Sequence, residues 1–332
     1  MQISTRLFLI FATTTLLFPG FSASVSAQRN PTPAQRNPTM TEQQRDSEKE
    51  AYYAKFLDHK RLATGEEQRL AYEAAQRYLE RFGGDNDANA HAVQKFVKEY
   101  QKFTHEYDIY EAYSAKNYLK TFEIGRPILQ KEPENFYVLG VLTEAGYENA
   151  IAGNATLNAE TIGYTRKAIQ LLDDGKVTKP DPFKSLDIAR GFLNSTLGWF
   201  LKDQSPVEAA GAFLKAIQSD SPYRTDPLIY HRLGIAILKG EFAQVSAEYN
   251  EKYGAKEPSP EQKAMFERVN HLGERAIDAY ARAVALSTTP QQQDLKTKIL
   301  AQLTTLYKNF HNNSDAGLNE LIASVLSKPL PL

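Results

Sequence analysis

Histidine and carboxylate side chains are the groups in this sequence best able to carry out chemistry, and they are scattered along the chain. The six histidines are His59, His91, His105, His231, His271 and His311. They lack the spacing of metal ligands. His105, Glu106 and Asp108 are close in sequence, but neighbouring positions on a helix do not face one another, so we expect no metal there. Asp173 and Asp174 follow an apolar-periodic segment, where a turn explains them better than acid–base catalysis does.

Known catalytic motifs are missing from the sequence. It has no His-Glu-x-x-His segment, no phosphate-binding glycine loop and no Gly-x-Ser-x-Gly segment. It has no cysteine, which excludes disulfides, thiolate metal sites and cysteine nucleophiles. Lys and Arg number 39 against 40 Asp and Glu, so the basic excess typical of nucleic-acid-binding proteins is absent. We therefore expect a non-enzymatic protein with no cofactor, no metal and no nucleic-acid partner.

The first 27 residues have the pattern of a secretory signal peptide. Arg6 precedes apolar residues at 7–12 and 16–18, and Val25-Ser26-Ala27 supplies the small residues that signal peptidase recognises. The apolar core is about a dozen residues, whereas a membrane-spanning helix needs roughly 20. We expect cleavage after Ala27 and an exported protein, periplasmic or secreted if bacterial, without a membrane span. A retained membrane anchor is the alternative.

Segment 28–41 predicts a disordered linker, because it is rich in proline and asparagine and repeats Gln-Arg-Asn-Pro-Thr. Beyond it, apolar residues recur at intervals of three and four, the period of amphipathic helices. Four capping residues stand directly before a proline, in Ser205-Pro206, Asp226-Pro227, Ser259-Pro260 and Thr289-Pro290. Proline at the first helical position loses no hydrogen bond, so these pairs predict helix starts. Glu208, Gln262 and Gln292 add capping-box spacing. We predict an all-α fold.

A second pattern pairs Leu-Gly on one helix with Ala–aromatic–Ala on the next. Its members are Leu197-Gly198 with Ala209, Phe213 and Ala216, and Leu233-Gly234 with Ala276, Tyr280 and Ala283. The interval from Gly198 to Gly234 is 36 residues. The pattern resembles the tetratricopeptide repeat (TPR), which has about 34. In such a pair Gly198 would leave room that Phe213 fills. The resemblance covers roughly 118–286 and implies a right-handed α-helical solenoid of antiparallel helix pairs.

The predicted organisation follows the chain in order. It comprises a signal peptide (1–27), a linker (28–41), N-terminal helices (42–115), TPR-like repeats (116–178), TPR-like repeats with an inserted helix at 241–253 (183–287), and a C-terminal capping helix pair (290–327). We expect the last residues, 328–332, to fray.

The resemblance also implies a binding groove, because the first helix of each TPR pair lines a concave face. Positions flanking the Leu-Gly pairs place nine residues there: Tyr137, Val141, Glu144, Ser195, Trp199, Lys202, His231, Ile235 and Lys239. Aromatic anchors combined with charges suit a peptide-binding groove. Trp199 could instead belong to the core, and Lys202 and Lys239 could simply be solvated.

The implied function is an exported, non-catalytic scaffold that binds a protein or peptide. One alternative is a structural subunit of a cell-envelope or secretion assembly. Another is an α/α-solenoid enzyme acting on envelope polysaccharide, which a pair of carboxylates facing one cleft would support.

Overall fold

The computed structural model describes residues 41–62, 65–253 and 259–330. The predicted signal peptide and all but the last residue of the predicted linker lie outside the described residues. Throughout the described part of the chain the regular structure is helical, with no β-strand, which confirms the predicted all-α class. Contacts divide the chain at Asp85 into two units, residues 1–85 and 86–332, and each is described by itself.

In the first unit, α1 (Glu42–Lys60) packs on α2 (Gly65–Phe82). Thr41 and Gln44 form the capping box that begins α1. The Thr41 hydroxyl accepts from the Gln44 N–H at 3.3 Å, and the Gln44 amide oxygen accepts from the Thr41 N–H at 3.0 Å. These two bonds satisfy donors that a helix start otherwise leaves without an acceptor.

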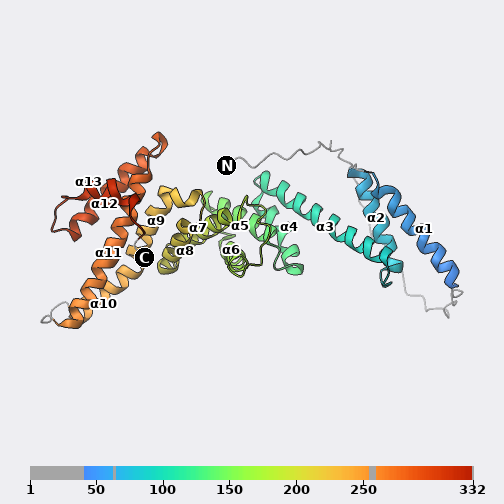
Figure 1. Cartoon of the computed structure of the whole chain (residues 1–332), viewed down its shortest axis with the longest axis horizontal. Coiled ribbons are helices and arrows are strands. Elements are labelled where there is room, and N and C mark those ends of the chain that lie inside the picture. Colours follow the sequence, from blue (N-terminus) through green and yellow to red (C-terminus); the bar gives the residue numbers. More distant parts are fainter. Residues whose placement is uncertain (1–40, 63–64, 254–258, 331–332) are drawn as a thin grey trace, which may run out of the picture. The chain divides into compact units, whose positions relative to one another are not determined.

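The second unit is a succession of helices. They are α3 (Ala88–Ser114), α4 (Tyr118–Lys131), α5 (Phe136–Ile151), α6 (Asn158–Asp173), α7 (Leu186–Leu201), α8 (Pro206–Gln218), α9 (Pro227–Ile237), α10 (Ala243–Tyr253), α11 (Pro260–Leu286), α12 (Gln293–Phe310) and α13 (Leu318–Ser324). From α3 to α9 each helix packs on the next, α9 packs on α11, and α11 packs on α12 (Figure 1). In addition, α3 contacts α5 and α5 contacts α7. One hydrophobic core runs from Ile109 to Val325.

The four prolines of the capping pairs are each the first residue of a helical segment, as predicted. Ser259 and Gln262 form the expected capping box at 3.2 and 3.3 Å. The capping box suggested by Ser205 and Glu208 is wrong, because the Ser205 side chain makes no cap bond. Glu208 instead accepts two hydrogen bonds from Arg166, at 2.8 and 2.9 Å, and so links α8 to α6.

Close helix approach explains the glycine of the Leu-Gly pairs. A Cβ at Gly198 would lie 2.8 Å from carbons of the Phe213 ring, which is fully buried. The predicted packing of Phe213 against Gly198 is therefore confirmed. Gly234 faces the Tyr280 ring in the same way, at 3.3 Å. The predicted inserted helix corresponds to α10, which follows α9 through a π-helical turn, Leu238–Phe242.

The expectation that the end of the chain frays is wrong for residues 328–330. Arg282 of α11 donates hydrogen bonds to the carbonyl oxygens of Lys328 and Pro329, at 3.0 and 2.9 Å. Leu330 packs against the core. A buried guanidinium thus holds this segment on the helices.

Candidate partner-binding face

Aromatic and acidic side chains from several helices of the second unit gather around α5. We call this group the aromatic–acidic face. Its members are Tyr113 of α3, Tyr118 of α4, Tyr137, Glu144, Tyr147 and Glu148 of α5, Phe192 and Trp199 of α7, and Tyr223 of the 3-10 turn Pro222–Thr225. The α5 members recur at helical intervals, which places them on one side of the helix.

Ring contacts connect the members that come from different elements. The Tyr147 ring meets the Trp199 ring edge-on at 5.4 Å and the Phe192 ring edge-on at 6.2 Å. Phe192, whose side chain is buried, in turn lies 6.4 Å from Tyr223. Edge-on aromatic pairs are worth roughly 0.5–1.5 kcal/mol each beyond area burial. These contacts therefore form one packed aromatic cluster, in which Tyr147, Trp199 and Tyr223 are partly exposed.

Glu144 lies among these rings with an unusual charge environment. Its side chain is partly buried, and burial raises the pKa of its carboxyl group to about 7. The neighbouring Glu148 carboxylate raises that pKa further, while a hydrogen bond from Tyr113 opposes the rise. In the described ranges no Lys, Arg or His forms an ion pair with either glutamate. The carboxyl groups of Glu144 and Glu148 thus stand one helical turn apart without a counter-ion.

The tyrosines around Glu144 remain neutral hydroxyl donors at ordinary pH. Burial, and then the Glu144 carboxylate, raise the pKa of Tyr113 and bring the pKa of Tyr223 to about 12. Burial also raises the pKa of Tyr137, whose hydroxyl donates to the Glu106 carbonyl at 3.2 Å. Hydroxyl groups from three elements therefore lie near one carboxyl group.

Three of the nine residues predicted to line a groove belong to this face: Tyr137, Glu144 and Trp199. Val141 is 2 % exposed and lies in the core. Ser195 is buried, and its hydroxyl donates to the Phe192 carbonyl at 2.9 Å, within its own helix. Both of these side chains are enclosed, so in this structure they contribute packing and not surface.

The two predicted lysines lie at the ends of their helices. The Lys202 ammonium lies 4.5 Å from the centre of the Trp199 ring, a cation–π contact. Lys202 and Lys239 each form an ion pair with Asp203 at 3.1 Å. Trp199 itself is only partly buried. Its ring therefore contacts Tyr147 of the face as well as Lys202.

The predicted α9 residues contact other elements. The Nε2 atom of His231 lies 2.7 Å from the side-chain oxygen of Gln302 in α12, and its ring lies 5.4 Å from that of Tyr280 in α11. Burial lowers the pKa of His231. Ile235 is partly buried against the core. The structure therefore separates these contacts from those around Glu144.

The sequence analysis does not predict several members of the face. Tyr147 and Glu148 stand three and four residues after Glu144, and Phe192 stands seven before Trp199. These intervals place residues on a common side of a helix. The sequence alone could therefore have assigned these three residues to the same helix sides as Glu144 and Trp199. Tyr113 and Tyr223 come from distant parts of the chain, and only the fold brings them to α5.

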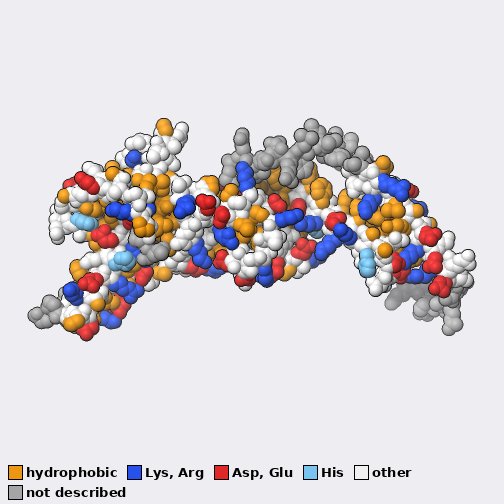
Figure 2. Space-filling view, in the orientation of Figure 1, with side chains coloured by type: hydrophobic (Ala, Val, Ile, Leu, Met, Phe, Trp, Pro, Cys, Tyr) orange, Lys and Arg blue, Asp and Glu red, His pale blue; other side chains and the backbone are white. Residues whose placement is uncertain are grey.

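The described ranges contain no group of three or more His, Asp and Glu side chains placed to hold a metal ion. None of the described helices combines the length and the apolar character that crossing a membrane requires. On the side shown in Figure 2, acidic and basic side chains are interspersed over the helices from α4 to α9.

Comparison of the chain with protein-family models and with curated proteins gives no match. The candidate face therefore rests on the geometry of this chain alone.

Proposed function

We propose that the helices of the second unit form a TPR-like right-handed solenoid of antiparallel pairs. Three observations support it. Helices adjacent in sequence pack on one another, and α5 also contacts α3 and α7, as first helices of successive pairs would. The Gly198–Phe213 and Gly234–Tyr280 contacts have the small-to-aromatic form of TPR pairs. In such a solenoid α3, α5 and α7 line the concave side, where the aromatic–acidic face lies.

We further propose an exported, non-catalytic scaffold that binds a protein or peptide segment carrying Lys or Arg on the aromatic–acidic face. The observation that carries this proposal is the pair Glu144 and Glu148, which lacks a counter-ion in the described structure. Like charges at this helical spacing destabilise a helix. A partner's cation would neutralise them, and the surrounding rings would add cation–π attraction. The chain already makes that contact between Lys202 and Trp199.

A polysaccharide-cleaving enzyme is the second candidate, because a carboxyl group with a pKa of about 7 has the property of a general acid. Geometry favours binding. Glycosidases place two carboxyl groups on opposite sides of the scissile bond. Glu144 and Glu148 leave one helix on the same side, one turn apart, and cannot flank a bond in that way.

A peptide array tests the binding proposal. The array presents extended peptides of varied sequence to the labelled protein at pH 8, and each bound peptide is then resynthesised with every Lys or Arg replaced by Gln. We expect bound peptides to share a basic residue whose replacement weakens binding about tenfold, the effect of losing about 1.4 kcal/mol. The double variant Glu144→Gln/Glu148→Gln should lose the same preference. Bound peptides without a basic residue would contradict the proposal.

The matched control is Glu267→Gln, which removes an exposed carboxylate of α11 outside the face. It should leave binding unchanged. Trp199→Ala should weaken binding while the helical circular dichroism is kept. If the wild type hydrolyses an envelope glycan and Glu144→Gln does not, the enzyme function is correct and the binding proposal is wrong. A tight complex with one protein that survives gel filtration would favour the structural-subunit alternative.

A further inference from the structure

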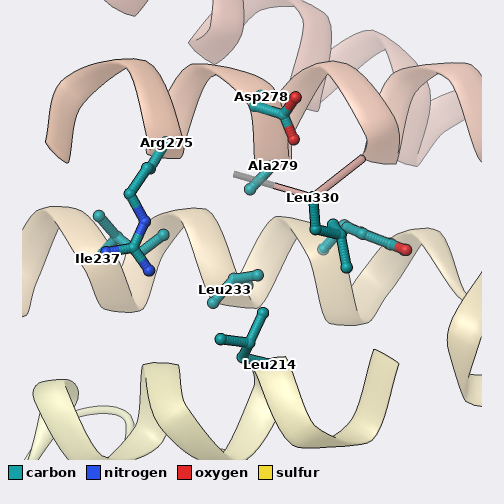
Figure 3. A pocket seen from close by; sticks show the side chains of 8 residues that line it. Leu214, Leu233, Ile237, Arg275, Asp278, Ala279 and Leu330 are labelled. Carbon is teal, nitrogen blue, oxygen red and sulfur yellow. The ribbon is translucent and has the colours of Figure 1, made fainter. Parts of the chain in front are cut away.

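A groove between α9 and α11 is occupied by the chain's own residues 328–330. Figure 3 shows Leu330 extending from the α11 side toward α9, above Leu214 of α8. Leu233 of α9 and Ala279 of α11 also line this place. We call it the α9–α11 groove. An apolar side chain on an extended segment thus lies in a socket built by three helices, which is mostly apolar but includes Arg275 and Asp278 of α11.

The extended segment is held by its backbone. The Arg282 side chain is 5 % exposed and binds the Asp278 carboxylate at 2.6 Å. Its guanidinium also donates to the carbonyl oxygens of Lys328 and Pro329. Every peptide offers such carbonyl groups, so the bonds do not depend on side-chain identity. Buried donors left without acceptors are costly, and Arg282 therefore requires an occupant in this place.

The groove also offers contacts that residues 328–330 leave unused. The Nε atom of Arg275 is buried and has no hydrogen-bond partner among the described residues. Arg275 lines the same pocket as Leu330, on the side of Ile237 (Figure 3), and also borders an adjoining cavity of about 210 Å³ together with Leu321 and Lys328. Arg275 therefore carries a buried donor that residues 328–330 do not satisfy.

We propose that the α9–α11 groove is a second peptide-binding site, which takes an extended partner segment containing Lys-Pro-Leu. The Leu side chain enters the socket, Arg282 binds the backbone, and the Lys lies toward the Asp278 carboxylate, as Lys328 does. Residues 328–330 are the resident competitor. Because they are tethered, their effective concentration is of millimolar order, and the site opens to a partner when they leave.

The test uses the full chain and a fluorescein-labelled peptide, Gly-Ser-Lys-Pro-Leu-Gly, followed by fluorescence anisotropy. In Leu330→Asp the resident segment loses its apolar anchor. We expect this variant to bind the peptide at least tenfold more tightly than the wild type does. A peptide with Asp in place of Leu should not bind. Glu144→Gln/Glu148→Gln should not alter this binding, so the outcome is independent of the proposed function.

Equal or undetectable binding by a folded Leu330→Asp protein would overturn the proposal, since the groove would then serve only to anchor the chain's end. If Leu330→Asp does not fold, Leu330→Ala replaces it, with the same expectation and the same contrary result. A concentration-dependent dimer of the wild type that Leu330→Asp abolishes, without peptide binding, would assign the groove to a second copy and also overturn the proposal.

Discussion

The Glu144 carboxyl group shows how burial of one ionisable side chain makes stability depend on pH. Burial is the larger cause of its raised pKa, about 7 in the folded protein, against about 4.3 in an unfolded chain. Between these values the folded protein holds a proton that the unfolded chain has lost. Stability therefore falls as pH rises from about 4.5 to about 7. Its partial exposure limits the loss to roughly 1–2 kcal/mol.

Glu144→Gln should remove this pH dependence, because the amide cannot ionise. We expect the free energy of unfolding at pH 8 to rise by roughly 1–2 kcal/mol, with little change at pH 4.5. Urea denaturation followed by circular dichroism at both pH values measures it. Glu267→Gln is the control and should change neither value. A variant less stable than the wild type at pH 8 would show that ionised Glu144 stabilises the fold.

At the same scale, the sequence predicts some members of the candidate face. Glu144 and Trp199 were predicted because they stand near Leu-Gly pairs, a local feature. Val141 and Ser195 were predicted by the same rule, but the closeness of the helices encloses them. Tyr113 and Tyr223 could not be predicted, because their approach to Glu144 depends on how three elements pack. Local periodicity predicts on which side of a helix a residue lies, but not which other elements pack against that side.

At the scale of elements, helix starts and intervals were predictable because capping residues, prolines and apolar periods act locally. Ser205 shows the limit of this reasoning. It has the cap–proline form, yet its partner Glu208 binds Arg166 of the neighbouring helix. The end of the chain shows the same limit, since residues 328–330 are ordered by Arg282, which lies far away in sequence.

Helix approach at Gly198 can be tested by adding one methyl group. Gly198→Ala would place a Cβ 2.8 Å from the buried Phe213 ring, so we expect a loss of roughly 1–3 kcal/mol from overpacking. The matched control is Gly211→Ala in α8, where nothing lies within 4 Å of the new Cβ. That change should stabilise the protein by up to about 1 kcal/mol through helix propensity. Thermal denaturation distinguishes them, and equal shifts in melting temperature would contradict the packing described.

At the scale of the whole molecule, the main hydrophobic core lies entirely within the second unit. A fragment of residues 86–332 should therefore fold by itself. We expect a helical circular dichroism spectrum, a cooperative thermal transition, and the same preference for basic peptides as the full chain, because every member of the aromatic–acidic face is retained. A fragment that aggregates or melts without cooperativity would show that the first unit completes the core.

If the aromatic–acidic face binds a cationic segment as proposed, the raised pKa of Glu144 couples that binding to the release of a proton. With a pKa of about 7, the carboxyl group is partly protonated at neutral pH, and a bound ammonium or guanidinium group would favour loss of the proton. Calorimetric heats of binding should therefore vary with the ionisation enthalpy of the buffer. A partner bound at neutral pH would then be released by acidification, without nucleotide hydrolysis or proteolysis.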